Sequence, residues 1–167
     1  MRTLHYIFMA IFSLFLFTAC GDDDGDDNGN GDPQPSNNSF TATVAGNTYT
    51  AAEGFPTAAY NSETEFLTIN AEDAEGNSIG LSVGVAPGTT GEFTVSGEQP
   101  NPVSILYTPA DGLPYNAQEG AGSITLDTYS DGSVSGSFNA TVTGSDGSNV
   151  TTLEITNGNF QVDYLTN

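Results

Sequence analysis

The side chains available for chemistry beyond position 20 are carboxylates, hydroxyls, amides and phenols. The chain has 167 residues, with 21 Asp and Glu, one His, one Cys and a single residue of the Lys and Arg type. Arg2 and His5 both precede Cys20, so no basic side chain follows it. Ser-His-Asp and Cys-His nucleophiles therefore cannot be assembled, and a zinc site lacks its usual ligands. We predict no catalytic residue, no metal site, no cofactor and no enzymatic activity.

Carboxylate pairs are the remaining route to catalysis, because glycoside hydrolysis needs only two suitably spaced acids. Most acids after residue 38 fall in expected turns or on solvated strand faces, and none lies in an apolar run that would make it a general acid. A solvated surface role is therefore favoured, and a carboxylate-only glycoside hydrolase is the third hypothesis for function. These acids are Glu53, Glu63, Glu65, Glu72, Asp73, Glu75, Glu92, Glu98, Asp111, Glu119, Asp127, Asp131, Asp146, Glu154 and Asp163.

Two loop clusters carry the hard oxygen ligands that calcium prefers. They are Glu72-Asp73-Ala74-Glu75 and Ser130-Asp131-Gly132-Ser133. A polar turn is the favoured interpretation of each cluster and calcium binding is the alternative, so we predict no metal site.

Tyrosines could form a platform on which a sugar ring stacks. The candidates are Tyr49, Tyr60, Tyr107, Tyr115 and Tyr129. Tyr60 and Tyr115 lie in irregular stretches rich in Pro, Asn and Ala, where we expect exposure. Packing in the core or at its rim is the favoured role for each ring, and sugar stacking is the alternative.

These side chains must be positioned by β-strands, because apolar residues alternate with polar ones from about residue 39 onward. Val134, Phe138 and Val142 share one face of a strand whose other face is rich in hydroxyls. We predict an all-β fold of about nine antiparallel strands, mostly a meander, arranged as a β-sandwich or an up-and-down β-barrel, with no helix. The expected strands span 40–44, 48–52, 66–71, 79–85, 92–96, 103–108, 124–129, 133–143 and 160–164, with a further short strand around Leu153 and Ile155.

Turn residues separate these strands. Gly46-Asn47 indicates a two-residue hairpin, and Asn157-Gly158 is the strongest such signal in the chain. Residues 107–122 contain Pro109, Pro114 and several glycines, so we expect a long loop there. No repeat or linker interrupts the pattern, and we predict a single domain over 39–167.

The first 19 residues have the features of a secretory signal peptide, with a short polar start and an apolar run over 6–17. That run spans roughly 18 Å as a helix, which is too short for a stable transmembrane anchor. It ends at Leu16-Phe17-Thr18-Ala19-Cys20, which resembles the lipobox of bacterial lipoproteins, with Phe17 departing from the usual pattern. The resemblance implies that Cys20 is the lipid attachment site and that the protein is held on a membrane by its acyl chains.

An acidic, glycine-rich segment over 20–38 follows Cys20 and is predicted to be a disordered linker, because it cannot bury apolar area. It resembles the acidic run near the lipidated Cys of Bacteroidota surface lipoproteins, where such a run acts as an export signal. The resemblance implies an outer-membrane, surface-exposed location. A solvated spacer is the alternative. The residues of the run are Asp22, Asp23, Asp24, Asp26 and Asp27.

Residues 39–165 also resemble a Bacteroidota surface-lipoprotein family of unknown function. The resemblance is carried by the opening Phe40-Thr41-Ala42-Thr43-Val44-Ala45-Gly46 and by three later segments, 122–127, 134–138 and 155–162. It implies location and fold, and no chemistry.

The net charge of −20 excludes nucleic acids as partners, since their affinity depends on Lys and Arg. The first hypothesis for function is a surface-tethered, non-catalytic binding or accessory domain for a glycan or a surface protein. The second is a structural envelope protein without a small-molecule ligand.

The same charge predicts how stability responds to salt. No ion pair can offset repulsion among the acids, so screening or partial protonation at about pH 5 should stabilise the domain. We expect the melting temperature to rise as salt increases from low to physiological strength. A flat or falling melting temperature would contradict this.

Overall fold

The computed structural model describes residues 38–97, 102–130 and 132–166. These residues form ten β-strands and no helix, which confirms the all-β prediction. The strands are β1 (Ser39–Val44), β2 (Asn47–Thr50), β3 (Thr57–Asn61), β4 (Phe66–Glu72), β5 (Ser78–Val83), β6 (Gly91–Thr94), β7 (Val103–Thr108), β8 (Tyr115–Ser130), β9 (Ser133–Ser145) and β10 (Val150–Thr166).

The hydrogen-bonded ladders return to their starting strand. β3, β4, β5, β7, β8, β9 and β10 pair in that order, and β10 then pairs with β3 to close a barrel-like ring. Six of these pairs are antiparallel, and the closing β10–β3 pair is parallel. With an odd number of strands that alternate in direction, one neighbouring pair has to run parallel.

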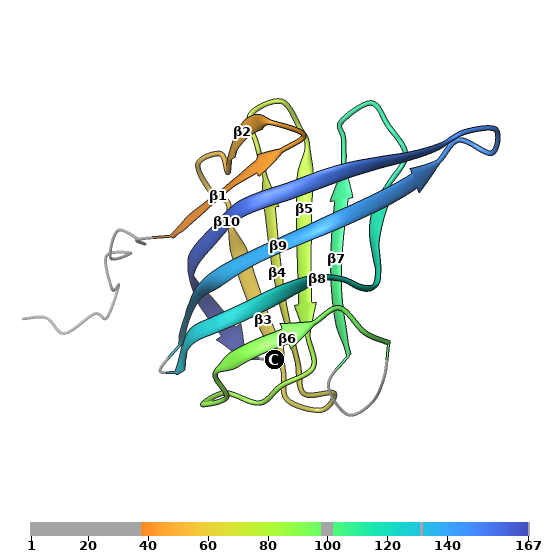
Figure 1. Cartoon of the computed structure of the whole chain (residues 1–167). Helices are drawn as coiled ribbons and strands as arrows, with labels where there is room; N and C mark the ends of the chain where they lie inside the picture. The colour runs from red at the N-terminus through yellow and green to blue at the C-terminus, as the bar shows by residue number, and fades with distance from the viewer. Residues whose placement is uncertain (1–37, 98–101, 131, 167) are drawn as a thin grey trace, which may run out of the picture. The chain divides into compact units, whose positions relative to one another are not determined.

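The ring has two walls that cross at a steep angle. In Figure 1 the slanted strands β8, β9 and β10 pass over the upright strands β4, β5 and β7. The hairpin of β1 and β2 lies along β10, and β6 lies along β8.

The inner faces of both walls form one hydrophobic core. In β9 every second residue is buried from Val134 to Gly144, as the alternation predicted. Rings from different strands meet inside, with the Phe40 and Phe138 ring centroids 5.0 Å apart. The largest side chains that are fully buried are Tyr129, Phe40, Leu67, Ile69, Ile79, Leu81, Ile105, Ile124, Leu126 and Ile155.

The predicted hairpin at Asn157-Gly158 is wrong, because β10 continues through it from Val150 to Thr166. The register against β9 shifts between Ile155 and Gly158, and Asn157 has a φ of 52°, so the pair forms a β-bulge. Gly158 is buried, and a Cβ there would lie 2.5 Å from the Phe138 ring. The glycine therefore makes room for an aromatic side chain instead of forming a turn.

Two other local predictions need correction. The first hairpin exists, but its two turn residues are Ala45 and Gly46, with φ of 49° and 83°, and Asn47 already belongs to β2. The expected loop over 107–122 is short, since β8 begins at Tyr115 and pairs with β7 at Tyr107. The strand β3 was not predicted, because its Ala-rich sequence alternates too weakly.

Candidate functional site

A cleft of about 250 Å³ lies at the end of the barrel formed by the β1–β2 turn and the β4–β5 turn. We call it the polar cleft, because two amides, two carboxylates and two phenols make up most of its lining. Its walls come from four separate parts of the chain. They are Val44, Ala45, Asn47, Thr48, Tyr49, Asp73, Glu75, Asn77, Tyr107 and Leu153.

Asn77 holds the floor of the polar cleft together. Its backbone N–H and its Nδ2 donate to Asp73 Oδ1 and Oδ2 at 2.9 and 2.8 Å. Its Oδ1 accepts a hydrogen bond from Ala110 N at 3.1 Å, and its carbonyl accepts one from the Tyr49 hydroxyl at 3.2 Å. One amide residue therefore joins β2, the β4–β5 turn and the loop after β7.

Removing the acceptor of this network should destabilise the protein. We expect Asp73→Ala to lower the free energy of unfolding by about 1–3 kcal/mol, because it leaves half-buried amide donors without their partner. Asp146→Ala is the matched control, because Asp146 makes the same kind of turn contacts with Ser148 and Asn149 but is fully exposed. Urea unfolding of both variants measures the difference, and equal losses would contradict the proposed role of Asp73.

The phenols near the cleft resist ionisation. Burial, and secondarily the Asp73 carboxylate, raise the pKa of Tyr49 well above its ordinary value and raise the pKa of Tyr107. Burial also raises the pKa of Tyr129, whose hydroxyl has no hydrogen-bond partner among the residues described.

This predicts a loss of stability at alkaline pH. A phenol whose pKa is higher in the folded state stabilises the fold below the unfolded pKa of about 10, and this contribution is lost as pH rises above that value. We expect the phenolate absorbance of Tyr49, Tyr107 and Tyr129 to appear only as the protein unfolds, with unfolding monitored by circular dichroism. Titration of these phenols near pH 10 in a chain that stays folded would contradict the burial.

The five candidate tyrosines divide into two groups. Tyr49, Tyr60 and Tyr129 are buried, so the expected exposure of Tyr60 is wrong; β3 turns its ring into the core against Tyr129. Tyr107 and Tyr115 are half-buried and lie opposite each other on β7 and β8, with ring centroids 6.1 Å apart. Of these two half-buried rings, Tyr107 lines the polar cleft.

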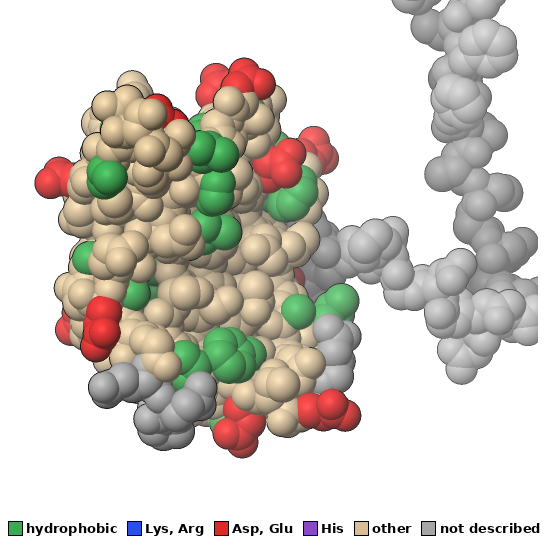
Figure 2. Space-filling model, turned by 90° about the vertical axis from the view of Figure 1, so that its right-hand side faces the viewer, with side chains coloured by type: hydrophobic (Ala, Val, Ile, Leu, Met, Phe, Trp, Pro, Cys, Tyr) green, Lys and Arg blue, Asp and Glu red, His purple; other side chains and the backbone are tan. Residues whose placement is uncertain are grey.

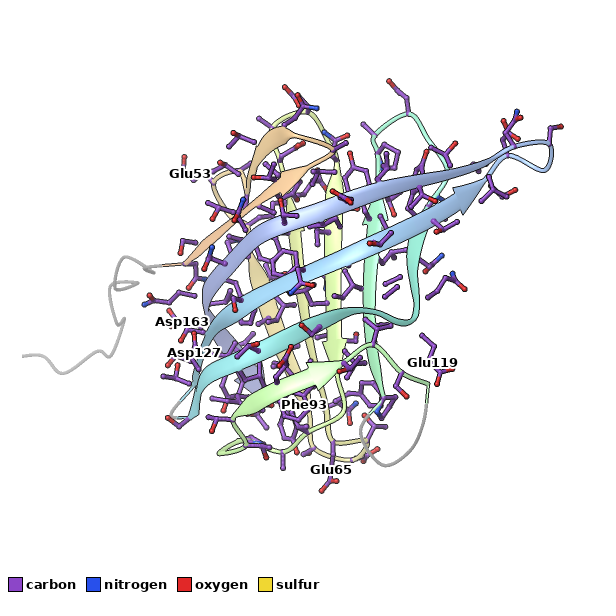
Figure 3. All side chains as sticks on the ribbon, viewed as in Figure 1. Glu53, Glu65, Phe93, Glu119, Asp127 and Asp163 are labelled. Carbon is purple, nitrogen blue, oxygen red and sulfur yellow. The ribbon has the colours of Figure 1, made fainter. Side chains whose placement is uncertain are left out.

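The described carboxylates do not converge on a catalytic arrangement. All of them are exposed except Asp73, which is half-buried and bonded within its own turn. Figure 3 shows Glu53, Glu65, Glu119, Asp127 and Asp163 spread around the periphery of the domain. Glu98 and Asp131 lie outside the described residues.

The two calcium candidates gain no support. Asp73 accepts hydrogen bonds from Glu75 N and Asn77 N, so the 72–75 cluster is an ordered polar turn. Asp131 of the second cluster is not described. Over 38–97, 102–130 and 132–166, no group of three His, Cys, Asp or Glu residues is placed to hold a metal ion.

Two further hollows are present. The first lies beside the polar cleft, and the second lies at the opposite end of the barrel. One of about 500 Å³ shares Glu75 and Asn77 with the polar cleft and continues along the loop after β7 to Asp111. The other, of about 380 Å³, is mostly apolar and lies where β7 and β8 separate, lined by Phe66, Val95 and Val103 among others.

Sequence reasoning missed the residue that organises the cleft, Asn77. The signal was present in the order Asp73-Ala74-Glu75-Gly76-Asn77, which is a sequence for a turn closed by an Asp side chain. The long-range partners of Asn77, Tyr49 and Ala110, could not be read from that local pattern.

The predicted signal peptide, the linker over 20–38 apart from Asn38, Cys20 and the acidic run lie outside the described residues. In the described part of the chain, no helix has the length and hydropathy needed to cross a bilayer. No protein-family profile, no curated protein and no solved structure matches this chain.

Proposed function

We propose that the protein is a lipid-anchored lipoprotein of the bacterial outer membrane, displayed on the cell surface, and that its β domain is a non-catalytic binding domain. The anchor is Cys20, and Asp22, Asp23, Asp24, Asp26 and Asp27 act as the export signal. The lipobox-like residues before Cys20, the acidic run after it and the likeness of 39–165 to Bacteroidota surface lipoproteins support this location.

The observation that carries the binding role is the polar cleft. Its floor is fixed in advance by the Asn77 network, while the half-buried ring of Tyr107 and the exposed side chains of Asn47 and Glu75 lie at its walls. A preorganised cleft with an aromatic ring and a few polar groups is typical of a ligand site.

The charge of the domain limits the ligand. Figure 2 shows acidic side chains distributed over the face displayed, with no basic side chain among them. The ligand class is therefore neutral or cationic, such as a glycan or a segment of a surface protein, and anions are repelled.

A thermal-shift screen of residues 36–167 against oligosaccharides, basic peptides, calcium and EDTA tests this role. A ligand at 100 times its dissociation constant should stabilise the domain by about 2.7 kcal/mol, which raises the melting temperature by several degrees. The shift should shrink in Glu75→Gln, which changes the cleft wall, and persist in the matched exposed control Glu63→Gln. No shift with any compound would overturn the binding role and leave the structural envelope hypothesis.

The export role has its own test. Replacing the five Asp residues of the acidic run with Asn should prevent added protease from reaching the protein on whole cells. Unchanged protease access would reduce the run to a spacer.

The hydrolase hypothesis stays third. It requires two acids that converge in a groove, and the described carboxylates supply no buried pair. No observation favours it over binding.

A further inference from the structure

Among the residues that the structure describes, none forms a ladder with one of the two backbone edges of the first residues of β10. From Val150 to Ile155, β10 pairs with β9 on one side. On the other side, β1 begins to pair with β10 only at Ile155. We call residues 150–153 the free edge; it lies near the projecting end of the β9–β10 hairpin in Figure 1.

The direction of the backbone groups follows from one hydrogen bond. Ala45 N donates to Glu154 O at 2.9 Å, so the polar groups of Glu154 face the β1 side of β10. Because alternate residues of a strand point their backbone groups the same way, those of Val150 and Thr152 also face that side. Both residues are exposed, with Val150 72 % accessible. This is a template to which another strand can add.

The free edge borders the polar cleft. Ile155 is buried, so Leu153, two residues earlier, points to the same inner side and lines the cleft together with Tyr107 and Glu75. A strand added to the free edge would place alternate side chains on this inner side, at the mouth of the cleft.

The negative charge around the free edge favours an added strand that carries a basic side chain. The free edge itself, Val150-Thr151-Thr152-Leu153, is uncharged, but Glu154 follows it and Glu75 and Asp73 lie in the adjoining cleft. No basic side chain is present after Cys20 to neutralise them. An acidic strand would meet like charge, whereas a Lys or Arg would meet carboxylates and the aromatic ring of Tyr107, which lines the cleft.

We propose that the free edge of β10 accepts an extended segment of a partner protein as an added β-strand, and that this segment carries a Lys or Arg that enters the polar cleft. This rests on the proposed binding function of the cleft and names its ligand class. Main-chain hydrogen bonds would supply affinity and the basic side chain specificity, as in other strand-addition complexes. A second copy of the chain fits less well, because it carries the same negative charge and a four-residue edge is far smaller than a stable dimer interface.

The probe is a labelled peptide with the sequence Thr-Val-Thr-Lys-Thr-Val-Thr, blocked at both ends, titrated against residues 36–167 by fluorescence anisotropy. Variants of the peptide replace Lys with Gln or with Glu. We expect the Lys peptide to bind about two- to fivefold more tightly than the Gln peptide, the Glu peptide to bind most weakly, and the Lys preference to shrink with salt.

The strand-addition geometry is tested by Thr152→Pro, which removes an N–H that faces the free edge without removing a bond to β9. We expect it to abolish peptide binding, while Thr152→Ala, which keeps the N–H, binds like the native protein. Val150→Pro is the second edge variant if Thr152→Pro fails to fold, as judged by circular dichroism.

Several results would overturn the inference. The first is that the Lys peptide does not bind up to about 1 mM, which corresponds to only about −4 kcal/mol. The second is that the peptide binds folded Thr152→Pro or Val150→Pro as tightly as it binds the native protein. The third is that the Glu peptide binds as tightly as the Lys peptide. If these occur while another ligand still gives a melting shift that Glu75→Gln reduces, the cleft is a binding site for a different ligand class and only strand addition fails. If no ligand binds at all, both proposals fail.

Discussion

Replacing Gly136 with alanine is expected to unfold most of the domain. Gly136 is buried in β9 opposite Leu126 of β8, and a Cβ at this position would overlap the carbonyl oxygen of Thr125 and lie 2.8 Å from the Phe160 ring. The Phe160 ring could adjust, but the Thr125 carbonyl belongs to a wall of the barrel and can move only if the β8–β9 ladder separates. The overpacking cost should therefore exceed the usual range of about 1–3 kcal/mol.

Gly97→Ala is the matched control for this substitution. Gly97 is exposed and does not have a positive φ, and apart from its chain neighbours no described residue has an atom within 4 Å of the position that a Cβ would take. Chemical denaturation should place Gly97→Ala within a few tenths of a kcal/mol of the native protein, and show Gly136→Ala unfolded or nearly so. A Gly136→Ala variant with the native midpoint would mean that the two strands do not approach this closely.

Truncating Phe138 to alanine is expected to cost about 3–5 kcal/mol of unfolding free energy. Its ring is 3 % exposed and packs against Phe40 and Phe160, with centroids 5.0 and 6.4 Å away. It also covers Gly158, whose bulge in β10 leaves no side chain to fill the space. The cavity would therefore open between β9 and β10, where neither neighbouring backbone can close it easily.

Phe55→Ala serves as the control, because Phe55 is 36 % exposed and outside the core. Urea unfolding should show a loss at Phe138 several times that at Phe55. Equal losses at the two positions would contradict the packing described for β9 and β10.

The sequence predicted strands best where alternation was strong. β9 was expected from the buried face of Val134, Phe138 and Val142, and the structure places all three in the core. β3 was missed, since its Thr-Ala-Ala-Tyr-Asn sequence becomes a strand only through pairing with β4 and the closing contact with β10. Tyr60 was accordingly expected at the surface and lies inside.

The error at Asn157-Gly158 has the same origin. An Asn-Gly pair favours a two-residue turn when only local preferences act. Here the long-range ladder with β9 continues on both sides of the pair, and the glycine accommodates the Phe138 ring. Because of this tertiary packing, the Asn-Gly pair forms a β-bulge and not a hairpin turn.

The candidate site was predictable only in its parts. Tyr49, Asp73 and Tyr107 were each considered from the sequence, as a stacking ring, a calcium ligand and a second stacking ring. Their meeting at one end of the barrel depends on the closure of the ring and on the contacts of Asn77 with Tyr49 and Ala110, which lie 28 and 33 residues away. No local pattern encodes those distances.

In the proposed function, the polar cleft and the edge of β10 beside it form the ligand site of the domain. Amide chemical shifts of isotope-labelled residues 36–167, recorded during titration with the compound that gives the largest thermal shift, test it most directly. We expect the largest changes in amide shift at Ala45, Glu75, Asn77, Tyr107 and Leu153, and no change at Glu63 and Gly97. Changes centred on the apolar hollow near Val95 and Val103, or spread evenly over the domain, would contradict it.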